Sequence, residues 1–80
     1  MDDSTIHERI EQLVDEEHAL WRRQTEGAID DDTKRRLLEL QVALYQMWDL
    51  LRQRKALRRA HLDPDTAEVR PAEIVENYRQ

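Results

Sequence analysis

The sequence contains no cysteine, no phenylalanine and only one glycine among its 80 residues. Without cysteine the chain can form neither a disulfide nor a thiolate zinc site. A single glycine excludes the glycine-rich loops that hold phosphates, and the only serine, Ser4, lies at an expected helix start rather than in a nucleophile motif. No apolar run approaches the roughly 20 residues that span a bilayer, and the first residues do not resemble a secretory signal. These features predict a cytoplasmic protein that is not an enzyme, binds no cofactor and enters no membrane.

Charged residues are abundant, at 39% of the chain, and they are segregated along it. Residues 2–17 carry seven acids and one base, whereas residues 52–59 carry five bases and no acid. The net charge of −5 argues against a general nucleic-acid-binding protein. This polarity predicts that the two segments pair with each other or attract a charged partner.

The first expected helix covers about residues 5–26 and ends before Gly27, the only strong break ahead of residue 63. Thr5-Ile6-His7-Glu8 fits a capping box at its start, and Gly27 fits the left-handed position after its end. At 100° per residue its apolar side chains form one stripe. These residues are Ile6, Ile10, Leu13, Val14, Leu20 and Trp21.

The second expected helix covers about residues 31–60 and begins after Asp30, a favourable cap. Apolar residues recur along it at alternating steps of three and four, which is typical of a coiled-coil seam. The seam consists of Leu37, Leu40, Leu44, Met47 and Leu51, and the flank consists of Leu38, Val42, Tyr45 and Trp48.

A connection of three to five residues forces the two helices to lie antiparallel, with facing residue numbers summing to roughly 58. Residues 63–80 form a tail, in which Pro71 is suited to begin a short helix at about 71–78. The sequence therefore predicts an all-α protein. Its residues 1–62 form an antiparallel, coiled-coil-like two-helix hairpin, and its C-terminal tail carries the short helix.

The apolar arc of the second helix approaches half of its circumference, which is more than one neighbouring helix can cover. A small hairpin that leaves this arc exposed has little net stability. The tail can fold back over the end of the second helix, setting Glu73 and Glu76 near Arg58 and Arg59. Two hairpins can also pair into an antiparallel four-helix bundle. We expect both, and therefore a homodimer; a different protein that supplies the missing face is the alternative.

Glu17 lies within the apolar stripe of the first helix, and Gln41 faces it across the hairpin. We expect either a buried polar layer that fixes the helix register, as polar core residues do in coiled coils, or a side chain that reaches water at the edge of the hairpin. A ligand or metal site is the alternative. The carboxylate–histidine spacing of Asp15 and His18 resembles that of helical di-metal bundles, but only one such pair is present.

Candidate partner-binding residues lie on the flank of the second helix, in its basic last turns and on the tail. They are Tyr45, Trp48, Arg52, Arg54, Lys55, Arg58, Arg59, Ile74 and Tyr78. The basic residues among them suit the negative end of the helix dipole and can simply be solvated there. The alternative is a nucleic-acid- or ribosome-associated protein that uses this basic end.

Three parts of the chain resemble one short actinobacterial family, catalogued as a domain of unknown function with the number 2630. They are Asp15-Glu16-Glu17-His18, Trp48-Asp49-Leu50-Leu51-Arg52-Gln53-Arg54, and Asp63-Pro64-Asp65 followed by Val69-Arg70-Pro71-Ala72. The second part is the most specific. The resemblance implies a standalone protein of about this length, and it implies no activity, so no functional residue is carried over.

Overall fold

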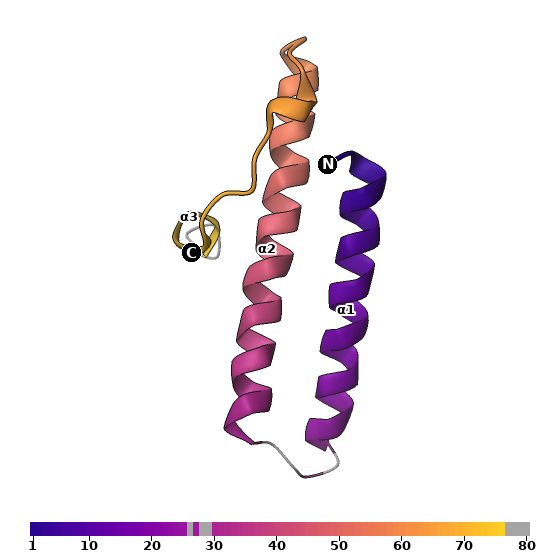
Figure 1. Cartoon of the computed structure of the whole chain (residues 1–80), viewed down its shortest axis with the longest axis vertical. Helices are drawn as coiled ribbons and strands as arrows, with labels where there is room; N and C mark the ends of the chain where they lie inside the picture. Colours follow the sequence, from indigo (N-terminus) through magenta and orange to yellow (C-terminus); the bar gives the residue numbers. More distant parts are fainter. Residues whose placement is uncertain (26, 28–29, 77–80) are drawn as a thin grey trace.

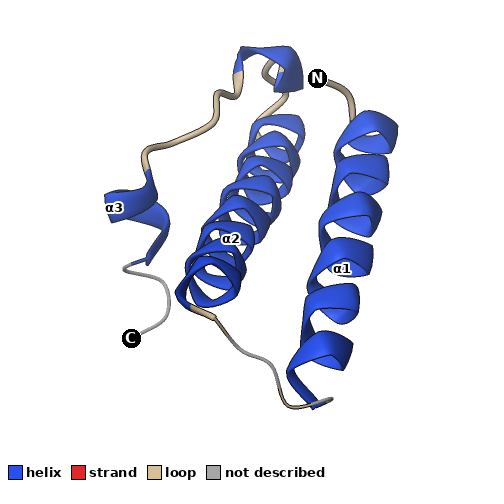
Figure 2. Ribbon diagram, turned by 60° about the horizontal axis from the view of Figure 1, so that its bottom comes forward, coloured by secondary structure: helices blue, strands red, loops and turns tan. Residues whose placement is uncertain are grey.

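The computed structural model describes residues 1–25, 27 and 30–76. It contains two long helices, α1 (Asp3–Thr25) and α2 (Asp31–Arg59), a 3₁₀ turn η1 (Pro64–Thr66) and a short helix α3 (Ala72–Glu76). The long helices lie side by side and antiparallel, and the tail runs back along α2 (Figure 1). In a view turned by 60°, α2 lies between α1 and α3 (Figure 2). The expected all-α hairpin with a helix-bearing tail is confirmed.

Helix α1 begins two residues earlier than expected, because its cap is Asp2 rather than Thr5. The Asp2 carboxylate accepts a hydrogen bond of 2.8 Å from the backbone N–H of Thr5. This bond lowers the pKa of Asp2. Thr5 is thus the residue that is capped, and the capping box expected at Thr5 and Glu8 is wrong.

The reversal between the long helices follows the expected local chemistry. Gly27 has a φ of 98°, and its N–H donates to the carbonyl of Gln24 at 3.1 Å, just past the end of α1. Asp30 caps α2 by accepting a hydrogen bond of 2.8 Å from the Thr33 N–H. A left-handed residue followed by a strong cap stops one helix and starts the next.

Within the described residues, the core lies between α1 and α2 and consists of six buried side chains. They are Ile6, Ile10, Leu13, Leu40, Met47 and Leu50. Burial of each contributes roughly 1.5–3 kcal/mol, which makes this seam the main source of stability. One edge of the seam carries the Glu16–Arg36 ion pair at 2.5 Å, and the other carries an edge-on contact of His7 with Trp48. The residue numbers in these two pairs sum to 52 and 55, so the facing residues are offset from the expected sum of roughly 58.

Helix α2 ends in a hydrogen-bonded reversal that lacks glycine. The Leu62 N–H donates to the Leu57 carbonyl at 2.8 Å, and the His61 N–H donates to the Arg58 carbonyl at 3.1 Å. These two bonds define a Schellman motif, whose left-handed position is usually glycine. Here His61 occupies it with a φ of 59°. The reversal turns the chain back along α2.

The tail passes through η1, which is capped by Asp63, and then runs without regular structure to α3. Because it continues past the C-terminal turns of α2, α3 lies beside the middle of that helix (Figure 1). The expected pairing of Glu73 with Arg58 and Arg59 is therefore not formed, and the Glu76 side chain lies outside the described set. Residues 77 and 78 of the expected short helix also lie outside it. Within the described residues, no helix is long and apolar enough to cross a membrane.

Candidate functional site

Helix α2 has three sides, each marked by residues three or four apart. One side packs on α1. A second side meets the strap, which we define as residues 63–71. The third side, which we call the open side, carries the exposed residues Leu38 and Trp48.

The strap is held mainly by side chains of α2 that bind its backbone. Gln53 donates to the carbonyl of Glu68 at 2.8 Å, and Gln46 donates to the carbonyl of Arg70 at 3.2 Å. Gln46 and Gln53 are seven residues apart, so they lie on the same side of α2. Their amides fix the path of an extended segment whose apolar Val69 is half exposed.

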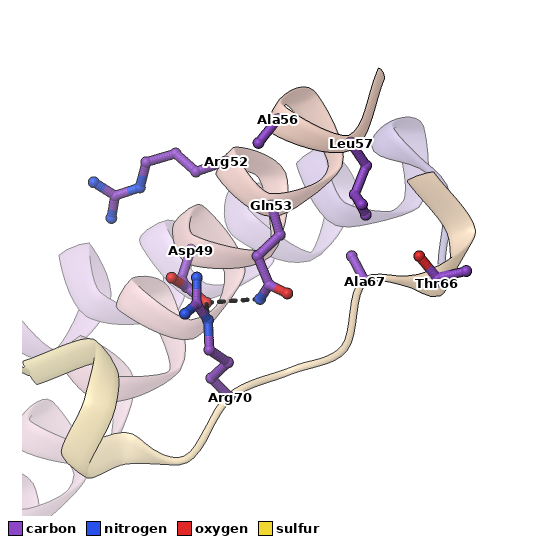
Figure 3. A pocket seen from close by; sticks show the side chains of 8 residues that line it. All are labelled: Asp49, Arg52, Gln53, Ala56, Leu57, Thr66, Ala67 and Arg70. Atoms are coloured by element: carbon purple, nitrogen blue, oxygen red, sulfur yellow. Dashed lines mark hydrogen bonds and ion pairs between the residues drawn. The ribbon is translucent and has the colours of Figure 1, made fainter. Parts of the chain in front are cut away.

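Asp49 of α2 is buried under the strap and binds it. Its side chain is only 1% exposed, and its Oδ2 accepts hydrogen bonds of 2.9 Å from Gln53 and from Arg70 (Figure 3). Burial of a carboxylate is costly unless it is paired, and the Arg70 guanidinium supplies the pairing charge. Within the described residues Oδ1 has no partner.

Arg54 joins three segments of the chain. It is 6% exposed, and its Nε donates to Asp3 of α1 at 2.6 Å. Its terminal nitrogen donates to the Pro64 carbonyl at 3.1 Å and to Asp65 at 2.9 Å. Arg54 was expected to face a partner, but it is committed within the chain because the strap and the start of α1 close over it.

Asp3, one of the partners of Arg54, has a strongly acidic carboxyl group. Arg58 donates to Asp3 at 2.7 Å. Hydrogen bonds from Arg58, and then from Arg54, lower the pKa of Asp3 to about 2. The bond with Asp3 in turn raises the pKa of Arg54. Arg54 and Arg58 are therefore already paired with acids of this chain.

A pocket of about 490 Å³ lies between the strap and α2 (Figure 3). The Asp49–Arg70 pair closes one end, and apolar atoms of Leu57 and Ala67 line the other. The Thr66 hydroxyl is engaged with the Asp63 carbonyl at 2.8 Å. Because most of its polar groups form hydrogen bonds with each other, the pocket resembles a packing interface between the strap and α2 more than a reaction centre.

The open side has the opposite character. Leu38, Gln41, Tyr45 and Trp48 follow one another along it at steps of three, four and three. Leu38 is 63% exposed and Trp48 is 46% exposed, and Trp21 of α1 is 47% exposed. A groove of about 320 Å³ opens beside Leu38 and Trp21, and it is lined by Glu17, Trp21, Gln24, Lys34, Leu37, Leu38 and Gln41. Large apolar residues gathered at a groove mark an interaction surface.

Glu17 and Gln41 do not form a sealed polar layer, and their positions agree with the other expectation, of side chains that reach water at the edge of the hairpin. Both are half-buried and line the groove, because the hairpin is open to solvent on this side. No hydrogen bond joins them in the part of the chain that the structure describes. Beside them Gln24 has a buried Oε1 with no partner among the described residues.

The remaining candidate residues lie in different places. Arg52, Lys55 and Arg59 are exposed and continue the three–four spacing of the open side beyond Trp48. Ile74 is 43% exposed on α3, and Tyr78 lies outside the described residues. Over the described ranges, no three acidic or histidine side chains gather as a metal site would require.

The Trp48–Arg54 segment thus contributes residues to both the strap side and the open side of α2, and it is the segment that most resembles a known family. A family model described as "Protein of unknown function (DUF2630)" matches residues 2–80. The chain belongs to this family. Uncharacterized proteins of Mycobacterium tuberculosis and Mycobacterium bovis are 44% identical to it over 77 residues, covering 95% of this chain and 88% of theirs. No solved structure matches.

In this DUF2630 protein the specific segment has a structural explanation that the sequence did not reveal. Asp49, Gln53 and Arg54 bind the strap, while Trp48 faces the open side. The Asp63-Pro64-Asp65 segment supplies partners of Arg54, and Val69-Arg70-Pro71 supplies the partner of Asp49. The signal in the sequence that could have revealed these contacts was the joint presence of the three segments, because ion pairs between them hold the tail on α2.

Proposed function

We propose that the protein is a non-enzymatic protein-interaction module, which acts in the cytosol as a homodimer of helical hairpins joined through the open side. The observation that carries the proposal is the exposure of Trp21 and Leu38 beside one groove and of Trp48 farther along the same side. Tryptophan is enriched among the residues that dominate binding energy at interfaces. Scattered exposed apolar residues need no explanation, but large ones that share one side of the molecule do.

The spacing of the open side favours a helical partner. Residues that repeat at steps of three and four form a straight seam along a helix, and such seams pack against other helices. A second hairpin would cover α1 and α2 together and complete a four-helix bundle. It would also bury the apolar arc that α1 and the strap leave exposed.

Sedimentation equilibrium over a range of concentrations tests the proposal. We expect a species of twice the 9.7 kDa chain mass for the wild type. Leu38→Glu should shift it to the monomer, because it places a carboxylate in the interface. Leu62→Glu is the matched control, since Leu62 is 60% exposed and lies beyond the end of α2. A wild type that remains at 9.7 kDa, or equal effects of the two substitutions, contradicts the proposal.

A second candidate function is binding of nucleic acid or of an RNA-rich particle through Arg52, Lys55 and Arg59. These bases are exposed at the end of α2 and share one side of it. The neutralisation of Arg54 and Arg58 by acids of the same chain weakens this candidate. It requires binding to RNA or duplex DNA that falls steeply with salt and is lost in Lys55→Glu/Arg59→Glu.

A further inference from the structure

The indole of Trp48 has an unused hydrogen-bond donor. Its ring and that of His7 form a T-shaped contact with 6.4 Å between centroids and an angle of 79° between planes. Within the described residues its Nε1–H donates no hydrogen bond, and nearly half of the residue is exposed. Tryptophan N–H groups that become buried in interfaces usually find an acceptor.

The groove on the same side offers what this indole lacks. Its walls include the apolar side chains of Trp21 and Leu38, and its rim carries the carboxylate of Glu17 and the amide of Gln41. Gln24 adds an acceptor oxygen with no partner among the described residues. A volume of about 320 Å³ can admit an aromatic side chain.

Trp48 cannot enter the groove of its own chain. It lies ten residues along α2 from Leu38, which corresponds to about 15 Å on a rigid helix. A second copy can bring its own Trp48 to the groove, and a two-fold axis makes the exchange reciprocal. The protruding group and the receiving site are thus present on one surface, as a self-complementary interface requires.

We propose that two hairpins pair antiparallel, with Trp48 of each copy inserted into the groove beside Leu38 of the other. This inference rests on the proposed homodimer and specifies its geometry. Moving seven residues outward from the contact brings residue 31 of one copy beside residue 55 of the other. The acidic start of α2, with Asp30, Asp31 and Asp32, then faces the basic end of the second α2.

Charge selects this orientation over the parallel one. In a parallel pair the two basic ends, each with Arg52, Lys55 and Arg59, would lie side by side and repel each other. In the antiparallel pair each basic end meets three aspartates. Electrostatic matching of this kind fixes orientation and suppresses the wrong pairing more than it adds affinity.

Complementing variants test the insertion. Trp48→Ala removes the inserted group and keeps the groove, whereas Gln41→Arg keeps Trp48 and fills the groove with a long cation. Each variant alone should raise the dimer dissociation constant by at least about 30-fold, the effect expected of a tryptophan that dominates an interface. Mixed together they should form a heterodimer, detectable by native mass spectrometry, because one insertion is restored. Circular dichroism must show wild-type helix content for both.

Cysteine crosslinking tests the orientation in a chain that has no natural cysteine. A mixture of Asp31→Cys and Lys55→Cys chains should crosslink through a short bis-maleimide, whereas Lys55→Cys alone should not. Crosslinking of Lys55→Cys to itself would overturn the antiparallel geometry and leave the dimer intact. A dimer that Trp48→Ala does not weaken would overturn the insertion alone, and a wild-type monomer at every concentration would overturn the proposed function as well.

Discussion

The strap side and the open side of α2 share one helical spacing and differ in chemistry. On the strap side Gln46, Gln53 and Asp49 meet groups of the same chain. On the open side Leu38 and Trp48 remain exposed. Trp48 and Asp49 are neighbours in sequence, yet one faces a solvent-exposed side and the other is buried under the strap. Where the tail supplies carbonyls, the helix presents amides, and on the open side it presents exposed apolar surface.

The largest effect on the strap side should come from Arg54→Ala. This change removes hydrogen bonds to Asp3, Asp65 and the Pro64 carbonyl from a buried position. We expect a loss of about 2–3 kcal/mol in the free energy of unfolding, measured by urea denaturation, since bonds to charged groups are the strong ones. Arg59→Ala, at an exposed position, should stay within about 0.5 kcal/mol of the wild type. Equal losses in the two variants would show that Arg54 holds nothing together.

Lowering the pH should weaken the ion pairs of Asp3 with Arg54 and Arg58 within a defined pH range. The folded-state pKa of Asp3 is lowered from 3.8 to about 2 by Arg58 and Arg54. A carboxyl group with a depressed pKa contributes its full stability above the unfolded value and loses it as pH falls through the folded one. The contribution should therefore be present above 3.8 and disappear towards pH 2.

Comparison of Asp3→Asn with the wild type isolates this contribution. Asp2, Glu16 and Asp30 also have lowered pKa values, so the wild type loses stability in acid for several reasons at once. The difference in unfolding free energy between Asp3→Asn and the wild type should shrink as pH falls from 3.8 towards 2. Glu8→Gln, an exposed change on the same helix, serves as the control. A difference that is constant with pH would exclude Asp3 as the titrating group.

The sequence predicted what depends on local chemistry. Gly27 and Asp30 predict a chain reversal because glycine can adopt the left-handed conformation that ends a helix and aspartate can cap the start of the next one. In the structure both residues do so. Arg54 was predictable in part, since it follows Leu40 and Met47 at intervals of seven and so continues the buried seam. The expectation that Arg54 binds a partner was wrong because Arg54 was grouped with the neighbouring bases instead of with Leu40 and Met47, the buried residues on its side of the helix.

The strap contacts were beyond the reach of the sequence. Gln46 and Gln53 bind backbone carbonyls, which every residue carries, so no side-chain pattern reveals the partner. The half-buried positions of Glu17 and Gln41 depend on which sides of α2 the tail covers. That choice is set by the reversal after α2, which carries no glycine to mark it.

The smallest expected effect concerns that reversal. His61 adopts a left-handed φ of 59°, which costs a residue with a Cβ roughly 1–2 kcal/mol relative to glycine. His61→Gly removes this strain but adds entropy to the unfolded chain, so the net gain in unfolding free energy should be up to about 1 kcal/mol. Thermal denaturation would detect it, and His61→Ala, which keeps the Cβ, should give no gain. Because the change acts where the chain turns towards the strap side, the dimer dissociation constant should be unaffected. A change in that constant would mean that the two sides of α2 are coupled.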